Sequence, residues 1–331
     1  MRIQNRNLNE FITNNIFKKK KYALIIGETP SSGARSPKLW NKVYRKYKIK
    51  IKMFPADVQK KNLSPLMNYL KLDDSFIGSA ITTPYKELIL NYIDFFSSEV
   101  HIIGSINTLK KMNKKLEGYN TDYFGAINSL SLFEKKKNIL VFGCGGAGKA
   151  VILASTKKFN NAFFYFFNRD KKKLRLFIKK LKIKNYKIVD YEKILSLRNI
   201  DLVINTTSIG FNSWILRNKK FYNLIHFTPF TNLKKIRGTR SKNKKEFFKK
   251  NHELIRQDKL NYLNFLEQNS NCEFFDIIYN PSMTKLLKLA KVNNHKILNG
   301  LKMNLDQAVK AFCIVNNKEF KKTNILMKKN G

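Results

Sequence analysis

A glycine-rich loop that follows a short apolar run restricts the fold of this chain more than any other feature. Residues 138–142 are typical of a buried strand, and a helical pattern continues through Ile152. Between them the loop has the spacing GxGxxG and consists of Gly143, Cys144, Gly145, Gly146, Ala147 and Gly148. In a βαβ unit such a loop lets the backbone approach a pyrophosphate at a helix N-terminus. We therefore predict a doubly wound α/β domain that binds a dinucleotide, with a ligand-free glycine turn as the alternative.

The residues after the next expected strand bear on the choice of dinucleotide. An NAD site places an acidic residue about 20 positions after the glycine loop, where it binds the ribose 2′-hydroxyl. This chain has Asn168 and Arg169 there. A neutral side chain beside an arginine suits a 2′-phosphate, so we predict NADP as the cofactor. Asp170 is the residue that would favour NAD, and the alternative for Arg169 is that it belongs to a general basic excess.

Apolar runs alternate with helical patterns along most of the chain, which indicates an α/β protein with largely parallel sheets. We expect strands at residues 22–26, 49–54, 77–82, 138–142, 162–167, 201–205 and 274–279, and a hairpin formed by 107–109 and 116–118. Helices are expected from Pro37, from Pro84 through Leu90, and at 286–290 and 301–314. The segment 212–271 is rich in lysine and too long for an ordinary connection, so we expect an insertion, part helical and part mobile.

The charge of the chain suggests a polyanionic partner at first sight. Lys and Arg total 65 and Asp and Glu total 23, which makes the net charge +42, and a basic surface attracts nucleic acid. However, 54 of the basic residues are lysine and only 11 are arginine, the side chain that forms bidentate phosphate contacts. The lysines are also spread along the whole chain. We therefore expect no nucleic-acid partner.

Several other classes of protein are disfavoured. No apolar run reaches the roughly 18–20 residues of a membrane-spanning helix. Residues 1–21 lack the apolar stretch and the cleavage site of a secretory signal. The three cysteines are too widely spaced for a disulfide framework or a CxxC metal motif, and the four histidines include no HxxxH pair. We expect a cytoplasmic protein with no metal site and no membrane contact.

Further short motifs occur in a fixed order around the glycine loop and Asn168-Arg169. They lie at residues 27–41, 81–87 (ITTPYKE), 104–108 (GSINT), 118–122 (GYNTD), 205–208 (NTTS), 276–281 (DIIYNP) and 299–307. With these motifs the chain resembles the shikimate dehydrogenase family over nearly its full length apart from the insertion.

The resemblance implies NADP-linked, reversible reduction of 3-dehydroshikimate to shikimate, a step of chorismate and aromatic amino acid biosynthesis. It also implies that Lys86 and Asp122 are the catalytic pair. Hydride delivery to a carbonyl carbon requires a proton for the developing alkoxide, and a positioned ammonium supplies both the proton and charge stabilisation. A nearby carboxylate holds the ammonium in place. The alternative for Asp122 is a helix cap or an Asx turn.

The resemblance extends to the other functional positions of the family. The substrate contacts that it implies are Ser36, Thr82, Asn107, Tyr279 and Gln307. The cofactor contacts that it implies are Gly143, Gly145, Gly146, Ala147, Gly148, Asn168, Arg169, Thr206, Thr207, Ser208, Gly300 and Met303. Helix packing is the alternative for Gln307 and Met303, and a turn role is the alternative for Asn107.

The chain departs from the family at four polar positions, of which the first is Gly33 in place of a histidine. Ala34 replaces the first serine of the Ser-x-Ser clamp for the substrate carboxylate, Ala80 replaces an asparagine, and Trp40 replaces a histidine. Arg35 or Ser32 could bind the carboxylate instead. Because a site built to bind a hydroxyl discriminates strongly, lost contacts change substrate preference. A dehydrogenase of quinate or of an aminoshikimate-like acid is therefore an open alternative.

These observations predict two domains. An α/β substrate-binding domain covers residues 22–122 and is completed by 299–325. A Rossmann NADP-binding domain covers 123–298 and contains the insertion at 212–271. The expected partner is a small cyclic hydroxy acid, and the expected assembly is a monomer or a homodimer. A non-catalytic homologue that binds nucleotide or nucleic acid is a further alternative, although the retention of Lys86 and Asp122 argues against it.

Overall fold

The computed structural model describes residues 8–14 and 21–328 and forms two compact units. Unit 1 consists of Met1–Asn128 and Leu305–Gly331, and unit 2 consists of Ser129–Asn304. The chain enters unit 2 within helix α4 (Thr121–Leu130) and leaves it within helix α10 (Leu301–Asn316). The boundaries expected at 122/123 and 298/299 lie near the beginnings of the same two helices. Residues 1–7 and 15–20 of the N-terminal stretch discussed above lie outside the described residues.

Unit 1 contains a mixed six-stranded sheet with the strand order β2-β1-β3-β5-β6-β4. Its strands are β1 (Lys21–Gly27), β2 (Ile51–Asp57), β3 (Phe76–Ile81), β4 (Phe95–Phe96), β5 (Thr108–Met112) and β6 (Lys115–Tyr119). β1 pairs in parallel with β2 and β3, whereas β5 is antiparallel to both β3 and β6. β5 and β6 form the predicted hairpin, and Asn113 in its turn has a φ of 55°.

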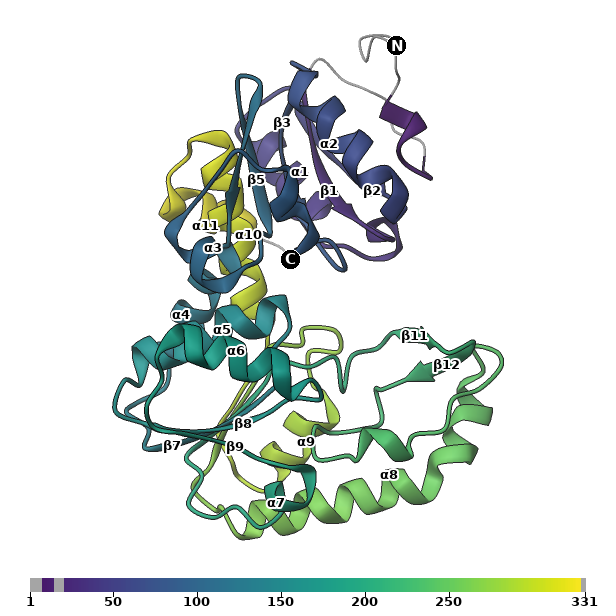
Figure 1. Cartoon of the computed structure of the whole chain (residues 1–331), viewed down its shortest axis with the longest axis vertical. Coiled ribbons are helices and arrows are strands. Elements are labelled where there is room, and N and C mark those ends of the chain that lie inside the picture. The colour runs from purple at the N-terminus through teal and green to yellow at the C-terminus, as the bar shows by residue number, and fades with distance from the viewer. Residues whose placement is uncertain (1–7, 15–20, 329–331) are drawn as a thin grey trace. The chain divides into compact units, whose positions relative to one another are not determined.

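Helices cover both faces of this sheet. On β1, Tyr22, Leu24 and Ile26 belong to one core together with helix α2 (Leu63–Leu72). Ala23 and Ile25 belong to a second core with α1 (Ser36–Lys46), α10 and α11 (Phe320–Lys328), the last two being yellow in Figure 1. A strand buried on both faces needs apolar side chains at every position, which explains the continuous apolar run. The remaining elements are α3 (Ser98–Ile103) and 3-10 helices at Leu8–Glu10, Pro30–Ser32, Lys60–Asn62 and Leu88–Tyr92.

Unit 2 contains a six-stranded parallel sheet with the order β14-β13-β10-β7-β8-β9. Its strands are β7 (Asn138–Phe142), β8 (Phe163–Phe167), β9 (Tyr186–Ile188), β10 (Leu202–Asn205), β13 (Glu273–Asp276) and β14 (Ile297–Leu298). Its helices include α5 (Gly146–Lys158), α6 (Lys171–Leu181), α7 (Tyr191–Ile194) and α9 (Lys285–Val292). The chain proceeds from β7 toward β9 and then returns to β10 on the other side of β7. This switch point confirms the doubly wound α/β fold, and ligands of such folds bind there.

The lysine-rich segment 212–271 has defined structure. It contains an antiparallel hairpin of β11 (Trp214–Arg217) and β12 (Lys220–Asn223), a 3-10 helix at Leu233–Lys235, and the long helix α8 (Lys244–Glu267), green in Figure 1. The expected helical part is confirmed. The limits of the insertion stay a prediction, although Tyr262, Phe265 and Leu266 of α8 lie in the main core of unit 2. The lysine-rich beginning of α8 obscured the apolar residues near its end.

The structure corrects the helix that was expected to begin at Pro84. Residues 84–87 form turns, and only Leu88–Tyr92 is helical, as a 3-10 helix. The carbonyl of Lys86 accepts a hydrogen bond from the backbone N–H of Ile106 (2.7 Å). That carbonyl is engaged by a segment far along the chain, so the local backbone does not form an α-helix here.

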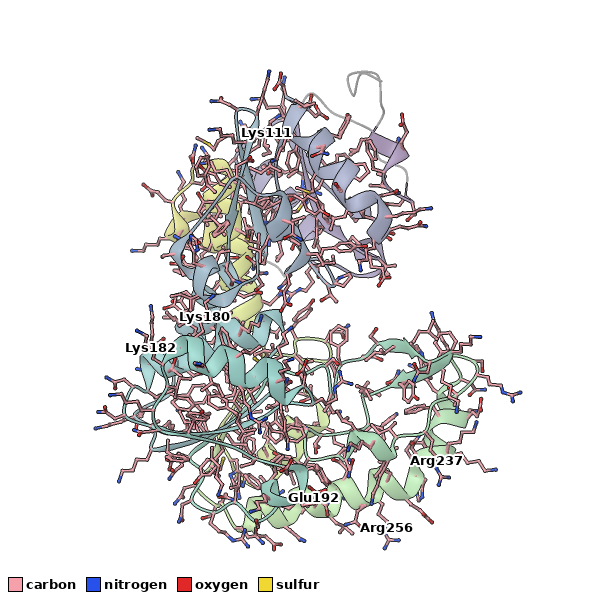
Figure 2. The ribbon with its side chains drawn as sticks, in the orientation of Figure 1. Lys111, Lys180, Lys182, Glu192, Arg237 and Arg256 are labelled. Atoms are coloured by element: carbon pink, nitrogen blue, oxygen red, sulfur yellow. The ribbon has the colours of Figure 1, made fainter. Side chains whose placement is uncertain are left out.

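Basic side chains project from many elements of both units. Figure 2 labels Lys180 of α6, Lys182 just after α6, Arg237 after the 3-10 helix Leu233–Lys235, and Arg256 of α8, and it also labels Lys111 of β5, whose side chain is only 6% exposed. This spread is what a general enrichment in lysine produces. Within residues 8–14 and 21–328, no helix combines the length and the apolar character that a bilayer crossing requires.

A buried carboxylate ties the carboxyl ends of β10 and β13 to the beginning of α9. Asp276 is fully buried and accepts hydrogen bonds from Asn205 Nδ2 (3.0 Å), the backbone N–H of Ile278 (3.1 Å) and Thr284 Oγ1 (2.7 Å). Thr284 is also the N-cap of α9. Burial raises the pKa of the Asp276 carboxyl from 3.8 to about 7, and the three hydrogen bonds oppose part of this shift.

We expect the Asp276→Asn substitution to alter the pH dependence of stability. Between about pH 4 and 7 the folded carboxyl keeps a proton that the unfolded chain has lost, so the free energy of unfolding falls as the pH rises, by at most about 1.4 kcal/mol per unit. Asparagine does not ionise, so the variant should lack this decrease. Urea unfolding midpoints of both proteins across this range measure the effect. Glu192→Gln, at an exposed acid of unit 2, is the control, and a constant difference between Asp276→Asn and the original protein would contradict the assignment.

Candidate active site

The strand directions in unit 1 bring several loops to one edge of the sheet. The parallel strands β1 and β3 end together, with Ile26 in register with Ile81. β5 is antiparallel to β3 and therefore begins at this edge, where the backbone N–H of Ile81 donates to the carbonyl of Asn107 (2.8 Å). β6 ends opposite the beginning of β5 and leads into α4. The loops after β3 and β6, which carry Lys86 and Asp122, therefore lie next to each other.

Lys86 and Asp122 form the predicted ion pair. Lys86 Nζ lies 2.5 Å from Asp122 Oδ2, with 21% of the lysine side chain and 9% of the aspartate side chain exposed. The helix-cap alternative for this motif applies to Asn120, whose Oδ1 accepts a hydrogen bond from the backbone N–H of Tyr123 (3.2 Å). The ammonium is therefore held by a mostly buried carboxylate and keeps partial access to solvent.

A buried amide fixes the other oxygen of Asp122. Asn107, which is 3% exposed, places Nδ2 at 2.9 Å from Asp122 Oδ1, 3.0 Å from Thr121 Oγ1 and 3.3 Å from Gln307 Oε1. The backbone N–H of Thr121 donates to Asn107 Oδ1 (2.8 Å). Asn107 and Gln307, both expected as substrate contacts, thus belong to the network that orients Asp122. Thr121 joins this network through its hydroxyl and was not among the predicted site residues, although it lies within the quoted GYNTD motif.

The segment between β3 and Lys86 is fixed by packing. Thr82 contacts the end of β1 so closely that a Cβ on Gly27 would lie 2.4 Å from Thr82 Cγ2. Tyr85 is buried and donates from its hydroxyl to the carbonyl of Val58 (2.5 Å). Burial, together with the nearby Glu28 carboxylate, raises the pKa of the Tyr85 phenol. The tyrosine of this motif therefore acts as a structural anchor that holds Lys86 at the edge of the sheet.

The loop after β1 supplies the candidates for binding the substrate carboxylate. Ser31 donates to Asp57 through both its hydroxyl and its backbone N–H, the latter at 2.9 Å. The hydroxyl of Ser32 donates to the carbonyl of Thr29 (2.7 Å). Arg35 and Ser36 follow at the beginning of α1, and both are partly buried. Because a guanidinium can bind a carboxylate through two charge-assisted hydrogen bonds, Arg35 is the better of the two candidates to replace the missing serine. Asp57, which holds this loop, was not predicted.

Packing explains the side chains at three of the positions where the chain departs from the family pattern, namely Trp40, Ala34 and Ala80. Trp40 is fully buried and packs edge to face against Phe312, with 5.4 Å between the ring centroids. Its Nε1 donates to the carbonyl of Ala308 (3.2 Å). Ala34 and Ala80 are partly buried and pack against the same core. The polar groups lost at these positions are thus replaced by apolar contacts with the α10 side of unit 1.

Unit 2 contains a pocket of about 570 Å³ at the switch point of its sheet. It is lined by the predicted cofactor residues Gly143, Gly145, Asn168, Arg169, Thr206, Thr207 and Ser208, among others. Gly143 has a φ of +96°, and a Cβ there would lie 2.6 Å from Thr206 Oγ1, so the turn requires glycine. A Cβ on Gly145 would meet nothing within 4 Å, which leaves room for a ligand beside the N-terminus of α5. The residues present therefore fit a dinucleotide.

The residues that follow β8 line this pocket and indicate which group it accepts at the 2′-position of the dinucleotide. Asn168 Nδ2 donates to the carbonyl of Asp170 (2.8 Å), and Asp170 Oδ1 accepts from the backbone N–H of Lys173 as the N-cap of α6 (2.8 Å). The carboxylate that could favour NAD is thus already used as a helix cap. Arg169 and Lys173 also line the pocket, which favours a phosphate at this position.

The remaining predicted residues also have defined positions. Gly146, Ala147 and Gly148 form the first turn of α5. Tyr279, Gly300 and Met303 belong to unit 2, where Tyr279 contacts Phe211 (6.3 Å between ring centroids) and Gly300 donates from its N–H to the carbonyl of Ile278 (3.0 Å). Met303 is 5% exposed on α10. None of these residues lines the 570 Å³ pocket. Among the residues that the structure describes, no group of three or more His, Cys, Asp or Glu side chains could hold a metal ion.

The arrangement in unit 1 suits proton transfer to an oxygen atom. The Lys86 ammonium is fixed by Asp122, and Asp122 is fixed in turn by Asn107, so the donor has a defined direction. The hydroxyls of Thr82 and Ser36 and the guanidinium of Arg35 belong to the segments that follow β3 and β1 at the same edge of the sheet. Such a set of donors recognises a hydroxylated carboxylic acid.

Comparisons with known proteins agree with this description. Residues 25–109 match the model of the shikimate dehydrogenase substrate binding domain. The shikimate dehydrogenase (NADP(+)) of Clostridium beijerinckii is 31% identical, and the match covers 87% of this chain and 88% of that protein. The structure of shikimate dehydrogenase from Aquifex aeolicus is 26% identical, with a TM-score of 0.68, and the match covers 95% of this chain and 100% of that chain.

A more distant structure shares the fold. Shikimate 5-dehydrogenase from Listeria monocytogenes, solved in complex with shikimate and NAD, is 21% identical with a TM-score of 0.69, and the match covers 96% of this chain and 99% of that chain. Similarity in sequence and structure therefore extends over both units. From the fold, the Lys86–Asp122 site and the similarity to the Clostridium enzyme over most of both chains, we conclude that this protein belongs to the shikimate dehydrogenase family.

Proposed function

We propose that this protein catalyses the NADP-dependent, reversible reduction of 3-dehydroshikimate to shikimate. The observation that carries the proposal is the Lys86–Asp122 pair, held by Asn107, in a chain that belongs to this family. The reaction provides a precursor of chorismate and aromatic amino acids. Unit 1 is assigned to the substrate and unit 2 to the cofactor, because the predicted contacts for each lie mainly in that unit.

Lys86 is the proton donor in the direction of reduction. NADPH, when bound, would supply the hydride for the carbonyl carbon, and negative charge would then develop on the carbonyl oxygen. Lys86 Nζ transfers a proton to this oxygen and becomes an amine, and in the reverse direction it accepts the proton from the substrate hydroxyl. Before transfer, the ammonium also stabilises the developing negative charge. Asp122 Oδ2 orients the ammonium, and Asn107 keeps Asp122 in position.

The substrate is assigned by the groups at the edge of the unit 1 sheet. Arg35 binds the carboxylate of shikimate, and Ser36 and Thr82 bind polar groups of the ring. The cofactor is NADP because Arg169 faces a pocket whose acid, Asp170, already caps α6. The three cysteines are buried free thiols, as expected in a reducing compartment, and we assign the protein to the cytoplasm as a monomer or homodimer.

The Lys86→Met substitution should lower kcat for shikimate oxidation by about 10²–10⁴-fold, because the proton acceptor is lost. The Kd for NADP should stay within about twofold, since Lys86 lies outside the nucleotide pocket. Initial rates of nicotinamide reduction and calorimetric titration measure the two quantities. Lys71→Met is the matched control because Lys71 forms a similarly exposed ion pair with Asp94 (3.0 Å). Near-normal turnover by Lys86→Met would refute the assigned role.

The Arg35→Ala substitution should raise the KM for shikimate by about 10–100-fold, because a charge-assisted hydrogen bond to the carboxylate is lost. The KM for NADP should change little. Ser32→Ala is the comparison, and it should leave the KM for shikimate nearly unchanged because the Ser32 hydroxyl is bound to Thr29. The opposite ranking of the two variants would assign the carboxylate to Ser32.

The Arg169→Ala substitution should raise the KM for NADP by about 10–100-fold and should affect the KM for NAD far less, since only NADP carries the 2′-phosphate. Arg175→Ala is the control, because Arg175 is exposed on the neighbouring helix α6 and does not line the pocket. Steady-state kinetics with both cofactors provide the test. Equal effects on NADP and NAD would argue against a phosphate at this position.

A further inference from the structure

The lysine-rich segment between β10 and α8 forms part of the nucleotide pocket. Ile215, Tyr222, Leu224, Leu233, Lys234 and Ile236 line the same 570 Å³ pocket as the glycine loop and Arg169. We call these six residues, together with Asn218 of the hairpin turn, which also lines the pocket, the insertion wall. Five of them are apolar or aromatic, and Lys234 is the one cation among them. None belongs to the motifs on which the family resemblance depends.

Local structure fixes the backbone of the insertion wall. The hairpin pairs Ile215 with Tyr222, and the backbones of Phe221 and Thr239 exchange two hydrogen bonds (2.8 and 3.0 Å). Leu224 and Ile236 share a small core with Phe247 of α8, and Leu233 packs against it. The wall is therefore attached to the rest of unit 2 on several sides.

The short helix that carries Lys234 is held at both ends. At its beginning, the Asn232 side chain accepts from the backbone N–H of Lys234 (3.2 Å). Beyond its end, Asn251 of α8, which is 2% exposed, binds Arg237 twice: Oδ1 accepts from the Arg237 N–H (2.8 Å), and Nδ2 donates to the Arg237 carbonyl (2.9 Å). Lys234 is thus presented to the pocket from a fixed backbone and keeps an exposed side chain.

The charges in the pocket indicate which part of the ligand Lys234 meets. Arg169, Lys173 and Lys234 line it together with one acid, Asp170, which caps α6. An uncharged ribose hydroxyl does not require three nearby cations, whereas a phosphate dianion is stabilised by several cations. The apolar members of the wall offer a surface for the adenine base.

We propose that Lys234, supplied by the insertion, is a further cation for the 2′-phosphate of NADP beside Arg169 and Lys173, and that the insertion wall closes the adenosine end of the pocket. This inference rests on the proposed function, since it concerns the same cofactor. It assigns to the insertion a role in cofactor specificity. Lys234 acts on binding and takes no part in the chemical step.

The neighbouring lysine provides a matched control. Lys235 is the next residue of the same 3-10 helix, is exposed, and lines a different surface depression with Arg237 and Lys249. The substitutions Lys234→Ala and Lys235→Ala remove the same charge from the same helix. If overall charge determines NADP binding, both variants should weaken it equally. If Lys234 contacts NADP directly, only Lys234→Ala should weaken it.

Calorimetric titration of the full chain with NADP and with NAD tests the proposal. Lys234→Ala should raise the Kd for NADP by about 5–30-fold and leave the Kd for NAD within about twofold, whereas Lys235→Ala should change neither. Lys234→Arg, which keeps the charge, should bind NADP within about threefold of the original protein. The Kd for adenosine 2′-monophosphate should follow that for NADP, because this fragment carries the same phosphate.

The outcomes separate this inference from the proposed function. If the original protein binds NADP more tightly than NAD and the ratio of the two Kd values is unchanged in Lys234→Ala, the role of Lys234 is refuted and the proposed function stands. Equal weakening of NADP and NAD in Lys234→Ala would also refute it. If the original protein binds NADP but does not oxidise shikimate, the proposed function fails, and the difference between Lys234→Ala and Lys235→Ala still decides the role of Lys234.

Discussion

The direction of the strands is the constraint on which both units depend. Parallel strands end at one edge of a sheet, so residues that follow them meet in space even when they lie far apart in sequence. In unit 1 this edge collects Lys86 and Asp122, because β5 and β6 reverse direction between them. In unit 2 it collects the glycine loop, Arg169 and Thr206 around the switch between β7 and β10. The chemistry of each unit therefore follows from its topology.

The buried polar groups at these edges serve mainly to position others. Asn107 binds Asp122 so that Asp122 can hold Lys86, and Asp276 joins β10, β13 and α9 below the loops that line the nucleotide pocket. A buried polar group without a partner would be costly, so each network is complete where it is least exposed. The residues that touch the ligands are thus a small part of a larger hydrogen-bonded support.

Only a few of the many basic residues have positions that connect them with function. Most lysines lie on exposed faces of many elements, and they obscured the apolar residues of α8 that pack into the core of unit 2. Lys86 differs from most of them because the mostly buried Asp122 holds it at the edge of the unit 1 sheet, and Lys234 differs from most of them because it lines the nucleotide pocket. Composition alone could not distinguish these two lysines from the other 52.

The sequence by itself determined the α/β class, the glycine loop, the positions of most strands along the chain and, through the motifs of the family resemblance, the identity of Lys86 and Asp122. These features depend on local periodicity and on short motifs, which neighbouring residues encode. Only the tertiary structure decided the contacts between distant segments: the engagement of Ser31 by Asp57, the role of Asn107 as a support for Asp122, and the turn after Pro84, whose Lys86 carbonyl is bound by Ile106. The tertiary structure also decided that the insertion lines the nucleotide pocket. Contacts with Phe247 and Asn251 of α8 place that segment, and no local sequence pattern encodes these contacts.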